Sequence, residues 1–297
     1  MSGEIYSCAN LAQKILLQTQ ADAEQFLQKT KRKPCLAVIL VGENPASQVY
    51  VKKKGETCIQ YGIDYKDFRL NDSENFSHLE NLIQHLNKDP TIDGILVQSP
   101  LPRGWDEKKI QAAIDPAKDV DGFNPWNAGM LSIDAKKVLR ESMPPCTPAG
   151  VMEILKEKNI SIAGKHAVVV GRSNIVGKPM ALMLLAENAT ITVCHSLTTN
   201  LIEECKRADI LIVAAGVPKL IREEHIKSGA VVIDVGMNRL PNPKNPGKNI
   251  LVGDCHTKLV AEKASFVTPV PGGVGPMTIA MLIRNTVRAA SNRLITQ

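Results

Sequence analysis

The sequence lacks the features by which membrane and secreted proteins are usually recognised. Its longest apolar runs, 180–186 and 210–215, are far shorter than the roughly 18 residues that a membrane-spanning helix needs. The opening Met1-Ser2-Gly3-Glu4 holds neither a basic segment nor an apolar stretch, so we expect no signal or transit peptide. The net charge of +6 predicts an anionic small-molecule ligand and neither a nucleic-acid nor a membrane partner.

Paired metal and disulfide motifs are also missing. The seven cysteines are odd in number and form no Cys-x-x-Cys, and several lie in apolar runs such as the one that starts at Cys35. This pattern predicts buried thiols in a reducing, cytoplasmic compartment. The six histidines are isolated, and none pairs with another ligand at metal-binding spacing, so no metal site is predicted.

What the sequence does contain is an alternation of short β-branched runs with longer segments of helical period. The 297 residues are enough for one large domain or two modest ones. The pattern predicts strands at 35–41, 64–70, 94–97, 166–170, 190–193, 210–213 and 230–233, with helices at 46–61, 76–87, 176–187, 200–208 and 276–294. The residues 99–148, rich in proline and glycine, are interpreted as loops and a linker, and 240–248 as a surface hairpin or loop.

The predicted fold is therefore α/β with two domains. Residues 1–143, completed by the C-terminal helix 277–297, form an N-terminal α/β substrate domain. Residues 144–276 form a C-terminal Rossmann-type nucleotide-binding domain, and we expect a cleft between the two.

A glycine-containing turn follows the strand 166–170 and precedes a helix, an arrangement that directs backbone N–H groups toward a phosphate. Only Gly171 fits the G-x-G-x-x-G fingerprint, because Ser173 and Val176 take the other glycine positions. A tight turn without a ligand stays an alternative. Arg172 in the turn, and the lack of a carboxylate at the end of the next strand, favour NADP over NAD.

Two residues on a predicted helix are candidates for chemistry. Tyr50 and Lys54 are four positions apart and so share one face, where an aromatic plane and an amine can act on a flat substrate. The alternative is that Lys52, Lys53 and Lys54 are a solvated run of charge.

Three further candidates lie at a strand end or in loop segments. Gln98 ends a strand, the place where ligands bind in open α/β sheets, although its amide can instead cap its own loop. Asp119 and Asp121 offer paired carboxylates, or alternatively an Asx-type turn. The segment 269–276 contains three prolines and three glycines before a helix, and we interpret this rigid, side-chain-poor path as a place where a ligand contacts backbone.

These features together resemble the bifunctional methylenetetrahydrofolate dehydrogenase/methenyltetrahydrofolate cyclohydrolase family, known as the FolD family. The resemblance covers nearly the whole chain in order, and its matching segments are 41–47, 50–54, 93–98, 118–123, 145–148, 171–177, 234–238 and 271–276. One departure is Ser99, where the family usually has Leu. This position lies on the substrate side, so the difference bears on folate packing.

The resemblance implies an NADP-dependent enzyme of one-carbon metabolism, expected to be a homodimer, that serves purine, methionine and histidine biosynthesis. It would oxidise 5,10-methylenetetrahydrofolate to 5,10-methenyltetrahydrofolate and hydrolyse that product to 10-formyltetrahydrofolate. Hydride loss leaves a cation that two nitrogens stabilise, so oxidation needs mainly positioning. Hydrolysis needs protons to move, which suits a partly buried lysine.

The resemblance also assigns roles to single residues. Catalysis would fall to Lys54, which handles protons, to Gln98, which tunes it, to Tyr50, which stacks on the folate rings, and to Asp121, which holds the amino edge of the pterin. Cofactor binding would involve Gly171, Arg172, Ser173, Ser196 and the backbone of Met237. The folate would be bordered by Tyr50, Val97, Gln98, Ser99, Asp121, Pro271, Gly272, Gly273, Val274 and Gly275.

Three alternatives stay open at this point. The chain could be a dehydrogenase that lacks cyclohydrolase activity or uses NAD, although Lys54 and the missing carboxylate argue against this. It could be an amino-acid or shikimate-type NADP dehydrogenase, which would not need the Tyr50 and Lys54 pair. It could also be a nucleotide-binding module without catalysis.

Overall fold

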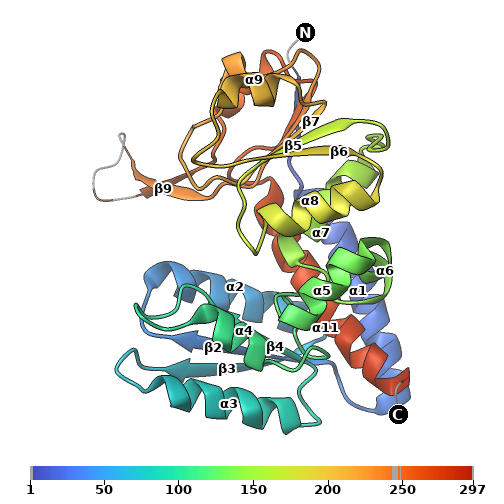
Figure 1. Cartoon of the computed structure of the whole chain (residues 1–297). Coiled ribbons are helices and arrows are strands. Elements are labelled where there is room, and N and C mark those ends of the chain that lie inside the picture. Colours follow the sequence, from blue (N-terminus) through green and yellow to red (C-terminus); the bar gives the residue numbers. More distant parts are fainter. Residues whose placement is uncertain (1–2, 243–246, 248, 296–297) are drawn as a thin grey trace. The chain divides into compact units, whose positions relative to one another are not determined.

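A computed structural model describes residues 3–242, 247 and 249–295 of the chain. The described residues divide into two compact units (Figure 1). The first unit is Gln13–Cys146 with the chain from Ile279 onward, and the second is Thr147–Thr278 with the chain up to Ala12. Each unit is an α/β structure with its own parallel sheet, as the sequence predicts.

The first unit is built on three parallel strands in the order β3-β2-β4. The central strand β2 (Cys35–Val41) is buried over its whole length, whereas β3 (Asp64–Leu70) is an edge strand with alternating exposure. In register, Leu40 of β2 lies opposite Gln98, the last residue of β4 (Gly94–Gln98). The register therefore fixes the carboxyl end of β4 beside that of β2.

Helices cover both faces of this sheet (Figure 1). The alternate side chains of β2 from Cys35 to Val41 pack with α3 (Phe76–Lys88) in one apolar cluster. The helix α2 (Pro45–Gln60) lies on the other face, where Gly55 allows the ring of Tyr65 to approach. A helix between successive strands on each crossover produces the predicted parallel order.

The region 99–148 is not a run of loops, so this prediction was wrong. It contains four helix starts, and each of the first three has a capping side chain: Asp106 before α4 (Glu107–Ala113), Asn124 before α5 (Pro125–Ile133) and Asp134 before α6 (Ala135–Glu141). The fourth helix is α7 (Cys146–Glu157). Pro125 is the first residue of α5 and Pro148 lies in the first turn of α7, where proline is tolerated, so part of the proline content that suggests loops belongs to helix starts.

The second unit is built on six strands in the order β1-β11-β8-β7-β5-β6, and every pairing is parallel. The order reverses between β5 and β7, because the chain first moves outward from β5 to β6 and then returns to β7 on the other side of β5. Such a switch point is where open α/β sheets bind ligands. The strands are β1 (Glu4–Ile5), β5 (His166–Val170), β6 (Thr190–Cys194), β7 (Ile210–Val213), β8 (Val231–Asp234) and β11 (Phe266–Val267).

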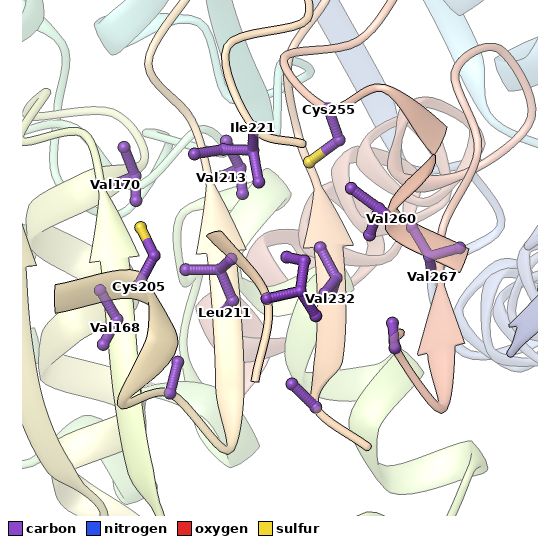
Figure 2. Packing of buried hydrophobic residues seen from close by; sticks show 14 of the residues in the cluster. Val168, Val170, Cys205, Leu211, Val213, Ile221, Val232, Cys255, Val260 and Val267 are labelled. Atoms are coloured by element: carbon purple, nitrogen blue, oxygen red, sulfur yellow. The ribbon is translucent and has the colours of Figure 1, made fainter. Parts of the chain in front are cut away.

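The core on one face of this sheet consists of small and β-branched side chains (Figure 2). Val168, Leu211 and Val232 come from three neighbouring strands, while Cys205 from α9 (Leu201–Lys206) and Val260 from α10 (Thr257–Ala261) cover them. On the opposite crossover, α8 (Gly177–Ala186) buries Met180, Met183 and Leu184. All seven cysteines of the chain are buried and unpaired, which confirms the predicted buried thiols.

The observed units differ from the predicted domains at the N-terminus. The prediction places the first residues in the substrate domain, whereas β1 pairs with β11 and so extends the sheet of the second unit. A two-residue strand carries no periodic signal, so it was not predicted. The long helix α1 (Ala9–Thr30) follows it, and α11 (Val274–Ile295) ends the described chain and begins two residues before the predicted start at Pro276.

The predicted hairpin at 240–248 lies partly outside the described residues. Its described arms are β9 (Asn238–Pro241) and β10 (Asn249–Val252), which pair antiparallel. A short 3-10 turn, η1 (Glu223–His225), precedes β8. Among the described helices, none combines the length and the hydropathy that crossing a bilayer requires.

A buried ion-pair group joins distant parts of the first unit. Asp93 is fully buried, and Arg32 donates to its two carboxylate oxygens at 2.6 and 2.9 Å. Arg293 of α11 donates to the same carboxylate at 3.2 Å, and the N–H of Cys35 donates to it at 3.0 Å. The carboxylate therefore ties together the segment after α1, the start of β2 and the end of α11.

We expect Asp93→Ala to lower the free energy of unfolding by about 3 kcal/mol, because two guanidinium groups lose their carboxylate. Urea denaturation measures this change. Glu141→Ala is the matched control, since Glu141 pairs with Arg140 at 4.0 Å on the surface, where an ion pair contributes at most about 1 kcal/mol. Equal effects of the two substitutions would show that the buried group has no special weight.

Candidate active site

Lys54 and Gln98 form the centre of a polar site in the first unit. The N-cap of α2 is Asn44, whose side-chain oxygen accepts the N–H groups of Ala46 and Ser47 at 2.9 and 3.2 Å. This cap fixes the start of the helix that presents Lys54. The Lys54 amine donates to Gln98 Oε1 at 3.0 Å. The predicted proximity of the two residues is therefore observed.

The orientation of the Gln98 amide is set by its other end. Gln98 Nε2 donates to the carbonyl of Ser99 at 2.7 Å, which leaves Oε1 directed at Lys54. Ser99, where the sequence departs from the family pattern, is exposed and takes part in this arrangement through its backbone carbonyl. Val97 and Gln98 are half-buried, and Tyr50 lies one turn before Lys54 on the same helix face.

Asp121 and Cys146 complete this centre. The Cys146 thiol donates to the carbonyl of Val120 at 3.3 Å and lies 3.8 Å from the Asp121 carboxylate. Burial lowers the pKa of the Lys54 amine, and the nearby Asp121 opposes that change. Burial likewise raises the pKa of Asp121, against the attraction of Lys54, and raises the pKa of Cys146 well above its usual value.

These directions have a chemical consequence. Desolvation brings the protonation equilibria of the amine and of the carboxyl group closer to neutral pH. A group whose pKa is near the working pH exchanges protons with a substrate most readily. The Lys54, Gln98, Asp121 and Cys146 centre is therefore suited to acid–base chemistry.

The two aspartates of the 119–121 loop have different surroundings. Asp119 is buried and accepts the N–H groups of Gly122 and Asn124 at 3.1 and 2.7 Å and the Asn127 amide at 2.9 Å. Burial raises its pKa to about 6 although these hydrogen bonds oppose the change. Asp119 therefore forms the turn that was one of the two interpretations of this loop. Asp121 is instead the aspartate that lies near Lys54.

Sequence reasoning missed two residues of this centre. Asn285, on α11, donates to the carbonyls of Val120 and Pro144, both at 2.8 Å, and so holds the backbone just before Asp121 and just before Cys146. Cys146 belongs to the matched segment 145–148 but was assigned no role. The sequence held no signal for Asn285, because α11 contains several polar residues and the sequence does not show which of them is buried.

A second polar site lies at the switch point of the second unit. Gly171 follows β5 with φ +126°, and a Cβ placed on it would lie 2.1 Å from the carbonyl oxygen of Ala214, which follows β7. The Gly171 N–H donates to the carbonyl of Cys194 at the end of β6 at 2.8 Å. Only glycine fits this turn, which brings the ends of three neighbouring strands together.

The predicted cofactor residues follow β5, β6 and β8 of the same parallel sheet. Arg172 and Ser173 are exposed and lie just before α8, and Ser173 Oγ accepts the N–H groups of Val176 and Gly177 at 3.2 and 3.4 Å. Ser196 is exposed and follows β6 by two residues, and Met237 is 48% exposed in the loop after β8. An exposed guanidinium beside a helix N-terminus fits the phosphates of a dinucleotide.

The predicted residues from Pro271 to Gly275 belong to the second unit, whereas Tyr50, Lys54, Gln98 and Asp121 belong to the first. In its own unit this segment is fixed by the carbonyl of Gly272, which accepts the Cys8 N–H at 2.9 Å. In the described part of the chain, no group of three or more His, Cys, Asp or Glu side chains is arranged for a metal ion.

A switch-point turn with an exposed arginine, together with a desolvated lysine centre, defines a nucleotide-binding enzyme with an acid–base site. Residues 7–121 match the family model of the tetrahydrofolate dehydrogenase/cyclohydrolase catalytic domain, and residues 145–294 match that of its NAD(P)-binding domain. The chain therefore belongs to the tetrahydrofolate dehydrogenase/cyclohydrolase family, which confirms the resemblance drawn from the sequence.

Similar proteins cover the whole chain. The bifunctional protein FolD of Acetivibrio thermocellus is 53% identical over 290 residues, which is 98% of each chain. A crystal structure of the FolD enzyme of Campylobacter jejuni is 46% identical with a TM-score of 0.91, covering 98% of this chain and all of that one. The Trypanosoma brucei FolD structure, complexed with NADP and an inhibitor, is 34% identical with a TM-score of 0.94 over 99% of each chain.

Proposed function

We propose that this chain oxidises 5,10-methylenetetrahydrofolate to 5,10-methenyltetrahydrofolate with NADP and hydrolyses that product to 10-formyltetrahydrofolate. The observation that carries the proposal is the partly buried Lys54 amine held 3.0 Å from Gln98 Oε1, in a chain that also has an NAD(P)-binding domain. A dehydrogenase without cyclohydrolase activity would need only the NAD(P)-binding domain. The lysine centre supplies the acid–base group that hydrolysis requires.

The second unit has the features expected of an NADP site. NADP, when bound, accepts a hydride from the carbon that bridges N5 and N10 of the folate. Gly171 and the start of α8 would hold the phosphates, while Arg172, Ser173 and Ser196 would hold the 2′-phosphate and the ribose, with the backbone of Met237 near the nicotinamide. The carboxyl end of β6 presents no carboxylate, and the NADP complex of a relative supports the choice of cofactor.

The first unit has the features expected of a folate site. Tyr50 would stack on the flat rings, Val97 to Ser99 would line the substrate, and Asp121 would hold the amino edge of the pterin. The segment from Pro271 to Gly275 would border the folate from the second unit. Hydride transfer requires contact between the folate carbon and the nicotinamide.

Hydrolysis would depend on Lys54. Water adds to the methenyl carbon and the tetrahedral intermediate then expels one nitrogen, so a proton must leave the water and another must reach the nitrogen. The Lys54 amine, with its pKa lowered by burial, is suited to both transfers. The hydrogen bond from Lys54 to Gln98 would keep the amine in position between the two proton transfers.

Substitution of Lys54 tests the proposal. We expect Lys54→Met to reduce cyclohydrolase turnover at least about 100-fold, because the proton-transfer group is lost, while dehydrogenase activity survives in part. NADPH absorbance follows the first reaction and loss of methenyltetrahydrofolate absorbance the second. Lys53→Met, an exposed neighbour on the same helix, is the control and should leave both rates unchanged. A parallel loss of both activities in Lys54→Met, or no loss, contradicts the assigned role.

Substitution of Arg172 tests the cofactor. We expect Arg172→Ala to raise the KM for NADP about tenfold or more and to leave the KM for NAD nearly unchanged, because only NADP carries the 2′-phosphate. Steady-state kinetics with each cofactor measure the ratio. Arg207→Ala removes an exposed arginine elsewhere in the unit and serves as control. Equal effects on the two cofactors would remove the 2′-phosphate role.

We also propose a homodimer in the cytoplasm. The seven unpaired, buried thiols support a reducing compartment. The edge strand β6 and the exposed Val193 and Leu197 support pairing with a second copy, since exposed apolar sheet edges favour association. Light scattering should give twice the chain mass of 32.3 kDa, and Val193→Lys should shift it toward the monomer, whereas Ile59→Lys in the first unit should not. A monomeric parent chain contradicts this proposal.

A further inference from the structure

Two fully buried aspartates lie near the carboxyl ends of the strands in the second unit and belong to neither of the polar sites described above. Asp234 is the last residue of β8, and Asp254 follows β10 by two residues. Neither belongs to the predicted site residues. Burial of a carboxylate is costly unless its oxygens accept hydrogen bonds, so the partners of these two groups show what they hold in place.

Asp234 connects the loop after β8 to the segment around Asp254. Its oxygens accept the N–H groups of Gly236 at 2.9 Å, of Asp254 at 3.0 Å and of Cys255 at 2.9 Å. The approach is so close that a Cβ on Gly253 would lie 1.8 Å from the Asp234 carboxylate. Glycine is therefore required at 253, and Asp234 fixes the backbone that presents Asp254.

Asp254 connects two loops that face the cofactor side of the sheet. One carboxylate oxygen accepts the N–H groups of Ala215 and Gly216, which follow β7, at 2.7 and 2.8 Å. The other oxygen accepts the side-chain amide of Asn238 at 2.8 Å, and Asn238 comes directly after Met237. All three donors are uncharged.

The peptide between Ala214 and Ala215 links Asp254 to the glycine turn. In a trans peptide the carbonyl and the N–H point in opposite directions. The N–H of Ala215 is directed at Asp254, so the carbonyl of Ala214 is directed away from it, and this oxygen is the atom that lies against Gly171. Asp254 therefore sets the orientation of the peptide that forms one wall of the switch-point turn.

A dinucleotide bound at a switch point spans the loops on both sides of it. With Arg172 at the β5 and β6 side, the remaining half of the cofactor would lie over the loops after β7 and β8. Those loops are the ones that Asp254 and Asp234 hold. The two carboxylates hold loop backbone that would contact the part common to NADP and NAD, and not the 2′-phosphate.

We propose that Asp254, held in place by Asp234, is a positioning residue that orients the loops 214–216 and 236–238 for binding of the nicotinamide half of the cofactor. The proposal rests on the proposed function, because it requires that the second unit bind NADP for hydride transfer. Since the cyclohydrolase step uses no nicotinamide, that activity serves as an internal measure of correct folding.

Asp254→Ala is the first test. We expect it to raise the KM for NADP and the KM for NAD by the same factor, about tenfold or more, because Ala215 and Gly216 lose their acceptor. Cyclohydrolase turnover should stay within about twofold of the parent. This pattern differs from that of Arg172→Ala, which affects NADP alone. Asp254→Asn keeps an acceptor oxygen but sets its amide against that of Asn238, so we expect a smaller rise, about threefold, for both cofactors.

The matched control is Asp209→Ala. Asp209 lies just before β7, at the opposite end of the same sheet, and accepts the His166 N–H at 2.9 Å and the Lys227 amine at 2.6 Å. We expect it to lower thermal stability without changing either KM.

Several results would overturn the positioning role: unchanged KM values in Asp254→Ala, a rise for NADP only, or a loss of cyclohydrolase turnover equal to the loss of dehydrogenase activity. If Asp254→Ala does not fold, unchanged KM values in Asp254→Asn overturn it. The absence of dehydrogenase activity in the parent chain would instead refute the proposed function.

Discussion

Burial of carboxylates that accept backbone N–H groups is the constraint on which both units of this chain depend. The aspartates at 93, 119, 234 and 254 are each at most 2% exposed, and each accepts at least one backbone N–H from a residue at a strand end or in a loop. A carboxylate can remain buried only where such donors converge, so its burial and the loop conformation require each other. In this way four aspartate side chains fix the backbone of segments whose own sequences do not determine their conformation.

The Lys54 centre is desolvated in the same way. Burial shifts the pKa values of Lys54 and Asp121 toward their uncharged forms, as it does for Asp119 despite the hydrogen bonds that Asp119 accepts. The scaffold next to them is rigid, because Asp119 organises the loop and Asn285 holds the carbonyl of Val120. The loop that carries Asp121 is thus held by hydrogen bonds from neighbouring residues, while the Asp121 carboxylate itself lies near Lys54 and Cys146.

Seven of the described parallel strands were predicted, most of them as short apolar runs whose burial dominates the local preference, whereas the two-residue strands β1 and β11 were not. The prediction failed between 99 and 148, where proline and glycine suggest loops although Pro125 begins α5 and Gly129 lies within it. The proximity of Lys54 and Gln98 followed from the family resemblance, because the position of Gln98 at a strand end left a loop-capping role open. The role of Asp254 could not be predicted, since the N–H groups it accepts lie 38 and 39 residues away and no spacing rule connects them.

In the proposed function, cofactor affinity and cofactor choice would be separated in the second unit. Arg172 on the exposed face of the turn would contribute a charge that only a 2′-phosphate uses, so its effect would be one of discrimination. Asp254 would contribute orientation, from which every dinucleotide would benefit equally. A variant of the exposed arginine would therefore alter the preference between NADP and NAD without disturbing the loops, because none of the hydrogen bonds that the described residues make with Asp234 or Asp254 involves it.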